Sequence, residues 1–138
     1  MEEMFCFQCQ QTAHNKCCDG KVGVCGKMAD TANYQDDIIG ALIALAQACE
    51  EGTPTEKTDA LVLKGLFTTI TNVNFNDVTI KQIKTEIEKE KGRVSAGKFP
   101  DYDMRLLWNE HVDIRSLKSL ILFGIKGMAA YAYHALAL

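Results

Sequence analysis

The stretch Ile38-Ile-Gly-Ala-Leu-Ile-Ala-Leu-Ala-Gln-Ala-Cys49 decides the fold class of this chain. Apolar side chains recur in it every three or four residues, which is the spacing of one face of an α-helix. Asp30 or Thr31 is expected to cap the amino end of this helix, and Gly52 with Pro54 to end it. The residues expected on the apolar face are Ile38, Leu42, Leu45, Ala46 and Cys49. The stretch therefore predicts a long amphipathic helix.

The helical period continues towards the carboxyl end. Cap-forming side chains precede two further periodic stretches, namely Thr55 or Thr58 before the first and Asn76 or Asp77 before the second. The breaks expected after them are Asn72-Val-Asn74 and Gly92. A short helix is expected within residues 101–111, and a long last helix from Ile114 with Asp113 as its cap. Amphipathic helices joined by short turns favour antiparallel neighbours, and we see no pattern for a sheet. We therefore predict an all-α helical bundle.

Composition limits the function classes. The chain has 138 residues, enough for one compact domain, and its net charge of −3 gives no electrostatic case for binding nucleic acid. Lys118 and Lys126 interrupt the apolar carboxyl-terminal run, so no uncharged stretch of the roughly 20 residues needed to span a membrane remains. We expect a cytoplasmic protein.

Cysteines gather before the first helix, in the order Cys6-Phe-Gln-Cys9, Cys17-Cys18 and Cys25. A Cys-x-x-Cys step lets two sulfurs approach one centre, and nearby glycines free the backbone to wrap round it. The spacing favours an iron–sulfur loop over residues 1–27, followed by the helical bundle over residues 28–138. A structural zinc site on four cysteines stays open as an alternative. A disulfide framework is disfavoured because the acidic start, Met1-Glu2-Glu3, does not resemble an export signal.

Several segments, in the same order, resemble the hybrid cluster proteins, also called prismane proteins or hydroxylamine reductases. They are Cys6-Phe-Gln-Cys-Gln-Gln-Thr-Ala, Gly23-Val-Cys-Gly-Lys27 with Gln35-Asp36, Leu66-Phe-Thr-Thr-Ile-Thr-Asn72, Asp113-Ile-Arg-Ser-Leu117 and Gly124-Ile-Lys-Gly-Met-Ala-Ala-Tyr131. The resemblance covers nearly the whole chain.

The resemblance implies a cluster bound by Cys6, Cys9, Cys18 and Cys25. The gap that is usual in that family, eight residues after the second cysteine, implies Cys18 as the third ligand, and Cys17 is its alternative. The short gap between the second and third cysteines favours [4Fe-4S], with [2Fe-2S] as the alternative found in relatives whose gap is longer.

Other candidate residues receive simpler interpretations. His14 lies inside the cysteine loop and could replace a thiolate, although four cysteines already suffice. Cys49 falls on the apolar face of a helix and is expected to be a core residue. No nucleophile arrangement or phosphate-binding motif is present, so we assign no catalytic residue.

The resemblance implies an electron-transfer role in a hydroxylamine reductase. An electron donor protein would reduce the cluster, which would pass electrons to a hybrid Fe–S–O cluster held by residues beyond Leu138. Residues 127–138 contain no acidic or basic side chain apart from His134, so we expect this end to be covered by a further part of the enzyme or by self-association. The alternative function is a non-catalytic helical module with structural zinc.

Overall fold

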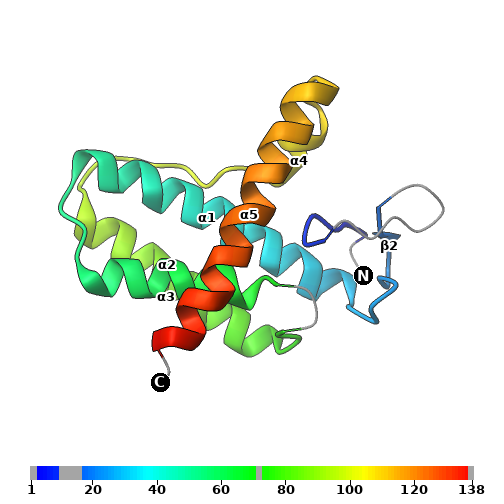
Figure 1. The fold of residues 1–138 in the computed structure, drawn as a ribbon, viewed down its shortest axis with the longest axis horizontal. Helices are drawn as coiled ribbons and strands as arrows, with labels where there is room; N and C mark the ends of the chain where they lie inside the picture. Colours follow the sequence, from blue (N-terminus) through cyan, green and yellow to red (C-terminus); the bar gives the residue numbers. More distant parts are fainter. Residues whose placement is uncertain (1–2, 10–16, 71–72, 137–138) are drawn as a thin grey trace.

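The protein is an arrangement of helices preceded by a short cysteine-rich segment (Figure 1). The structure is a computed structural model, and it describes residues 3–9, 17–70 and 73–136. The elements in chain order are β1 (Met4–Phe5), β2 (Asp19–Gly20), α1 (Ala29–Glu51), α2 (Glu56–Thr68), α3 (Asp77–Val94), α4 (Met104–Trp108) and α5 (Val112–Leu136). The all-α prediction is confirmed. The expectation of no sheet is wrong only for the antiparallel pair β1–β2, whose strands have two residues each.

The core lies along α1, which makes its most extensive contact with α3. The isoleucine stripe of α3 faces α1 as its spacing predicts, with Ile80, Ile83 and Ile87 at most 2% exposed. Leu45 and Ile38 of α1 are fully buried against this stripe. Ala46 was expected on the same face but is exposed, and the alanines at positions 41, 44 and 48 are buried instead. Small side chains on α1 thus allow close approach of its neighbours.

Two of the expected caps are confirmed. Thr55 and Thr58 form a capping box at the start of α2, in which the Thr58 hydroxyl accepts from the Thr55 backbone N–H at 2.9 Å. The Asn76 side chain accepts from the backbone N–H groups of Val78 and Thr79 at the start of α3. These local signals therefore fix both helix starts.

Other helix boundaries differ from the predictions. Helix α1 begins at Ala29, and the Thr31 hydroxyl donates to the Asp77 carboxylate at 2.6 Å, which ties α1 to the start of α3. Helix α3 runs past Gly92 to Val94, whose side chain is buried in the core. Helix α5 begins at Val112, so Asp113 lies in its first turn. Tertiary contacts therefore override the local signals at the start of α1 and at the end of α3.

Helix α5 crosses the other long helices steeply (Figure 1). Its main partner is α2, against which Tyr133 stacks on Phe67 with ring centroids 4.4 Å apart. The largest contacts of the fold, α1 with α3 and α2 with α5, join helices that are not consecutive, unlike the expected antiparallel neighbours. The large apolar side chains of α5 that remain exposed are Val112, Ile114, Leu117, Leu120, Ile121, Ile125, Met128, Tyr131 and Leu136. None of the helices in the described part has the length and apolar character of a membrane span.

Candidate metal centre

The strand pair brings the first and third predicted ligands together. Met4 pairs with Gly20 and Phe5 with Asp19, and just beyond the ladder the Cys6 backbone N–H donates to the Cys18 carbonyl at 3.0 Å. The side chains of Cys6 and Cys18 both pack on a small apolar cluster formed by Met4, Ala29 and Ala32. Two cysteines twelve positions apart in the sequence thus become neighbours because a short strand pair joins their segments.

A tight turn brings the fourth predicted ligand to the third. Gly26 takes a φ of +84°, and its N–H donates to the Gly23 carbonyl at 2.9 Å. A Cβ placed on Gly23 would lie 3.7 Å from the sulfur of Cys18 and equally far from that of Cys25. The two sulfurs therefore lie close to one common point. The Val24 backbone N–H also donates to the Cys18 sulfur at 3.4 Å, the kind of contact that stabilises a thiolate ligand.

The adjacent thiol of Cys17 has different surroundings. Its sulfur donates to the Cys18 carbonyl at 3.6 Å. Burial, followed by the negative charge of Asp19, raises the pKa of Cys17 to about 11. The Cys17 thiol is therefore protonated at neutral pH in this arrangement, and it donates to the backbone of its neighbour.

The remaining candidates are placed as follows. Cys6 and Cys9 are half-buried and Cys25 is exposed, and none of the six cysteines, all of which are described, forms a disulfide. Within residues 3–9, 17–70 and 73–136, no group of three or more cysteine, histidine or acidic side chains is arranged to hold a metal ion. His14 lies outside the described residues. Cys49 is half-buried and packs against the core, as predicted.

A buried polar chain runs beneath the Cys-x-x-Cys step, and the sequence interpretation missed it. Gln8, between Cys6 and Cys9, is 3% exposed. Its amide NH2 donates to the Asp36 carboxylate of α1, and its amide oxygen accepts from the Lys126 ammonium of α5 at 2.5 Å. The Lys126 ammonium also donates to the Thr69 carbonyl at 3.4 Å. Gln8 therefore links the loop to two helices that are far apart in the sequence.

A second buried lysine lies near Cys6. The Lys27 ammonium donates to the Gln35 side chain, and Gln35 in turn donates to the carbonyls of Asn74 and Thr68. Lys27 is 2% exposed and Gln35 fully buried. Burying a lysine is costly unless polar partners surround it, and the Gln35 side chain is such a partner for Lys27.

Burial shifts the ionisation of both groups that Gln8 joins. It raises the pKa of Asp36 to about 7, against the opposing effects of the Gln8 hydrogen bond and of Lys126. It lowers the pKa of Lys126 to about 8, while Asp36 acts in the opposite direction. Burial also raises the pKa of the Cys6 thiol. A sequence signal for Lys126 existed, because it is the one charged residue in the apolar sequence stretch 119–133.

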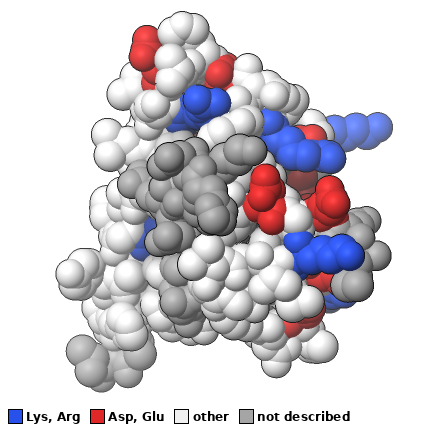
Figure 2. All heavy atoms as spheres, turned by 90° about the vertical axis from the view of Figure 1, so that its right-hand side faces the viewer, with Lys and Arg blue, Asp and Glu red and all other residues white. Residues whose placement is uncertain are grey.

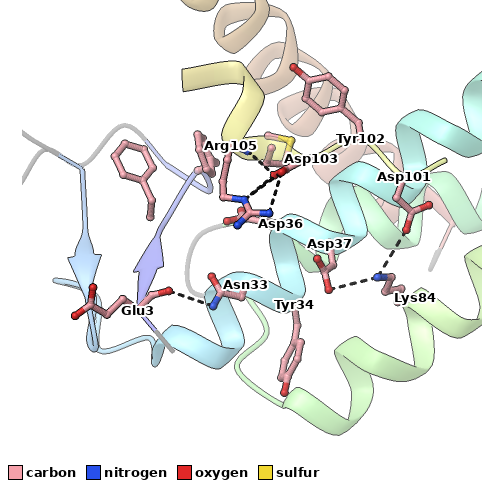
Figure 3. A pocket seen from close by; sticks show the side chains of 13 residues that line it. Glu3, Asn33, Tyr34, Asp36, Asp37, Lys84, Asp101, Tyr102, Asp103 and Arg105 are labelled. Carbon is pink, nitrogen blue, oxygen red and sulfur yellow. Dashed lines mark hydrogen bonds and ion pairs between the residues drawn. The ribbon is translucent and has the colours of Figure 1, made fainter. Parts of the chain in front are cut away.

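A hollow of about 670 Å³ lies beside the cysteine region, between β1, α1 and the segment leading into α4 (Figure 3). Some of its charged groups form pairs. The Lys84 ammonium lies 3.3 Å from the Asp37 carboxylate and 3.7 Å from that of Asp101. Arg105 donates to Asp103. Charges of both signs are likewise intermixed on the molecular face seen in Figure 2. Acidic groups are in excess in the lining of the hollow, which contains Glu3, Asp36, Asp37, Asp101 and Asp103 against Lys84 and Arg105.

The comparison with protein families identifies the class to which this fold and cysteine region belong. The model of the Prismane/CO dehydrogenase family matches residues 4–138. The match includes all four predicted ligand cysteines and every described helix. The chain therefore belongs to the Prismane/CO dehydrogenase family, and the resemblance described from its motifs is confirmed.

Similar curated proteins carry the name hydroxylamine reductase. One from Caldanaerobacter subterraneus subsp. tengcongensis is 39% identical over 164 aligned positions, which cover 96% of this chain and 30% of the relative. One from Thermoanaerobacter pseudethanolicus is 40% identical over 161 positions, covering 96% and 29%. One from Desulfitobacterium hafniense is 38% identical over 165 positions, covering 98% and 30%. The chain thus spans about 30% of the length of the curated relatives it matches.

Proposed function

We propose that this chain is the iron–sulfur electron-transfer part of a hydroxylamine reductase of the hybrid cluster type. The observation that carries the proposal is the family match over residues 4–138, which contains the Cys6, Cys9, Cys18 and Cys25 pattern. An electron donor protein in the cytoplasm would deliver the electrons. A hybrid cluster on residues outside these 138 would reduce hydroxylamine to ammonia.

The chemistry of the donor set fits an iron–sulfur cluster. A [4Fe-4S] cluster on four thiolates exchanges single electrons without needing a substrate pocket. The two sulfurs beside Gly23 and the Val24 N–H support Cys18 and Cys25 as ligands. Cys6 is held beside Cys18 by the backbone hydrogen bond between them. We propose that residues 1–27 form the cluster-binding loop and residues 28–138 its helical support.

Colour and metal content test the proposal directly. Protein purified without oxygen is expected to be brown and to contain about four irons and four sulfides per chain. Structural zinc on the same four cysteines, the alternative function, gives a colourless protein. Stoichiometric zinc with no sulfide after anaerobic reconstitution would contradict the cluster and support the zinc module.

The same preparation tests whether the substrate site lies outside this chain. We expect the cluster-loaded chain to accept electrons from a reduced viologen but not to turn over hydroxylamine, because the reactive metal of the enzyme would lie on other residues. Turnover well above that of free iron–sulfur cluster would place the substrate site within this chain.

We further propose that the exposed apolar face of α5 binds the remaining part of such an enzyme. Nine large apolar side chains of α5 are exposed, and the relatives are more than three times as long as the matched region. A face of this kind usually marks an interaction surface. Leu120→Lys and Ile121→Lys are expected to weaken binding of a separately produced remainder, and persistence of a dimer of this chain at low concentration would favour self-association instead.

A further inference from the structure

Helix α5 buries a charge and exposes its apolar neighbours. Lys126 is 3% exposed, whereas Ile125 is 43% and Met128 73% exposed. An apolar side chain at position 126 would avoid the cost of removing an ammonium group from water. The buried lysine therefore requires a partner that gains from its charge.

The contacts of Lys126 lead to the predicted cluster ligands. Its ammonium donates to the amide oxygen of Gln8, which lies between Cys6 and Cys9, and to the Thr69 carbonyl. The ammonium also lies close enough to Cys6 and Cys9 for the negative charge of their thiolates to favour its protonated form. The lysine reaches the loop across 118 positions of sequence, so only the folded chain brings the two together.

Two buried ammonium groups lie beside the Cys6–Cys9 step. Among the described residues, Lys126 and Lys27 are buried there, and the carboxylate of Asp36, which accepts from Gln8, is the acidic group that faces them. Thiolate ligands bring negative charge to this place, and a metal cluster gains a further electron when it is reduced. Net charge nearby is one of the factors that set the reduction potential of such clusters.

We propose that Lys126 is a positioning residue of the iron–sulfur site, which holds the Cys6–Cys9 step through Gln8 and raises the reduction potential of the cluster by its positive charge. This inference rests on the proposed function. It adds a role for α5, whose other described features concern packing and exposure.

Potentiometric titration of the loaded protein, followed by electron paramagnetic resonance, tests the role. Lys126→Met is expected to shift the midpoint potential to more negative values. Lys126→Gln also removes the charge but keeps an N–H donor for Gln8, so the same direction of shift is expected with the loop still held. Lys126→Arg keeps the charge and is expected to return the potential towards that of the unmodified protein.

Lys118→Met is the matched control. Lys118 lies on the same helix, is 45% exposed and pairs with Glu110 at 2.6 Å. Removing this charge is expected to leave the potential unchanged because solvent screens it. Equal potentials for Lys126→Met, Lys126→Gln and Lys118→Met would overturn the inference.

Iron and sulfide analysis before each titration distinguishes a failure of this inference from a failure of the proposed function. Loss of the cluster from both neutral variants, with retention in Lys126→Arg, would support the role of the charge. Loss from all three variants would overturn it, since packing alone would then explain the lysine. Zinc without sulfide in the unmodified protein would overturn the proposed function and this inference with it.

Discussion

The α1–α3 interface and the cysteine region are held together by different forces. The interface is apolar, with the isoleucine stripe of α3 fully enclosed against α1. The cysteine region has a much smaller apolar cluster, formed by Met4, Ala29 and Ala32. Its other described contacts include a two-residue strand pair, turn hydrogen bonds, the polar chain through Gln8, and the packing of Phe5 and Phe7.

This difference indicates which region needs a ligand. Apolar burial stabilises the helices without any bound group. The cysteine region instead gathers thiols and buried ammonium groups. The ammonium groups attract the thiols once these are ionised, and a bound metal keeps them in the thiolate form. We therefore expect the helices to fold with or without the cluster, and the cysteine region to be stabilised by loading.

Replacement of a cluster ligand should have the largest effect, because it should remove iron from the cysteine region while leaving the helices intact. We expect Cys18→Ser to lose most of its iron after anaerobic reconstitution, because a serine cannot replace the thiolate beside Gly23. Helix content measured by circular dichroism should stay close to that of the unmodified chain. Cys17→Ser is the matched control and should keep nearly all its iron. The reverse pattern would move the ligand to Cys17, and mild effects of both would show that the two thiols can substitute for each other.

Truncation of a buried side chain in the α1–α3 interface should instead lower the free energy of unfolding. Leu45→Ala is expected to lower the free energy of unfolding by about 2–5 kcal/mol, because Leu45 is fully buried and its loss leaves a cavity. Urea denaturation followed by circular dichroism measures the change. Leu120→Ala, on the exposed face of α5, should change it by less than about 0.5 kcal/mol. Equal effects of the two substitutions would contradict the distinction between a packed core and an unpartnered face.

The helices could be predicted from the sequence because their signals are local. The Thr55 and Asn76 caps and the isoleucine spacing of α3 each lie within one or two turns. The start of α1 could not be predicted in this way, because the Thr31 hydroxyl donates a hydrogen bond to Asp77, a residue 46 positions away. The strand pair was also missed, since strands of two residues contain too few side chains to show an alternation.

The candidate site was predictable in its ligands but not in its surroundings. Cysteine spacing and the family motifs single out the thiols, whereas the partners of Gln8 come from α1 and α5. Lys126 entered the sequence argument as a charge that interrupts an apolar run and as a member of the motif over residues 124–131, with no role assigned to it. A lone lysine among apolar residues is a signal for a buried partner, but its identity depends on how α5 crosses the bundle.

A close backbone contact gives a smaller test of the core region. A Cβ on Gly40 of α1 would lie 2.2 Å from the Tyr102 carbonyl oxygen, so Gly40→Ala must separate α1 from the segment before α4. We expect a loss of about 1–3 kcal/mol in the free energy of unfolding. Gly124→Ala is the matched control, because nothing lies within 4 Å of its added Cβ, and alanine should stabilise α5 by about 0.5–1 kcal/mol. Effects of the same sign would contradict this account.

The smallest expected effect concerns the pH dependence of the helical region. Hydrogen bonds from Arg93 and Thr58 hold the pKa of Glu90 at about 2, below its ordinary 4.5. A carboxylate with a lowered pKa stabilises the folded state above pH 4.5, and this contribution is lost as the pH falls towards 2. The contribution is modest because Arg93 is 41% exposed. Glu90→Gln should therefore flatten the decline of stability between pH 4.5 and 2 in urea titrations of the cluster-free chain. Glu51→Gln, at the exposed end of α1, should leave the decline unchanged, and an equally steep decline in Glu90→Gln would show that other carboxylates cause it.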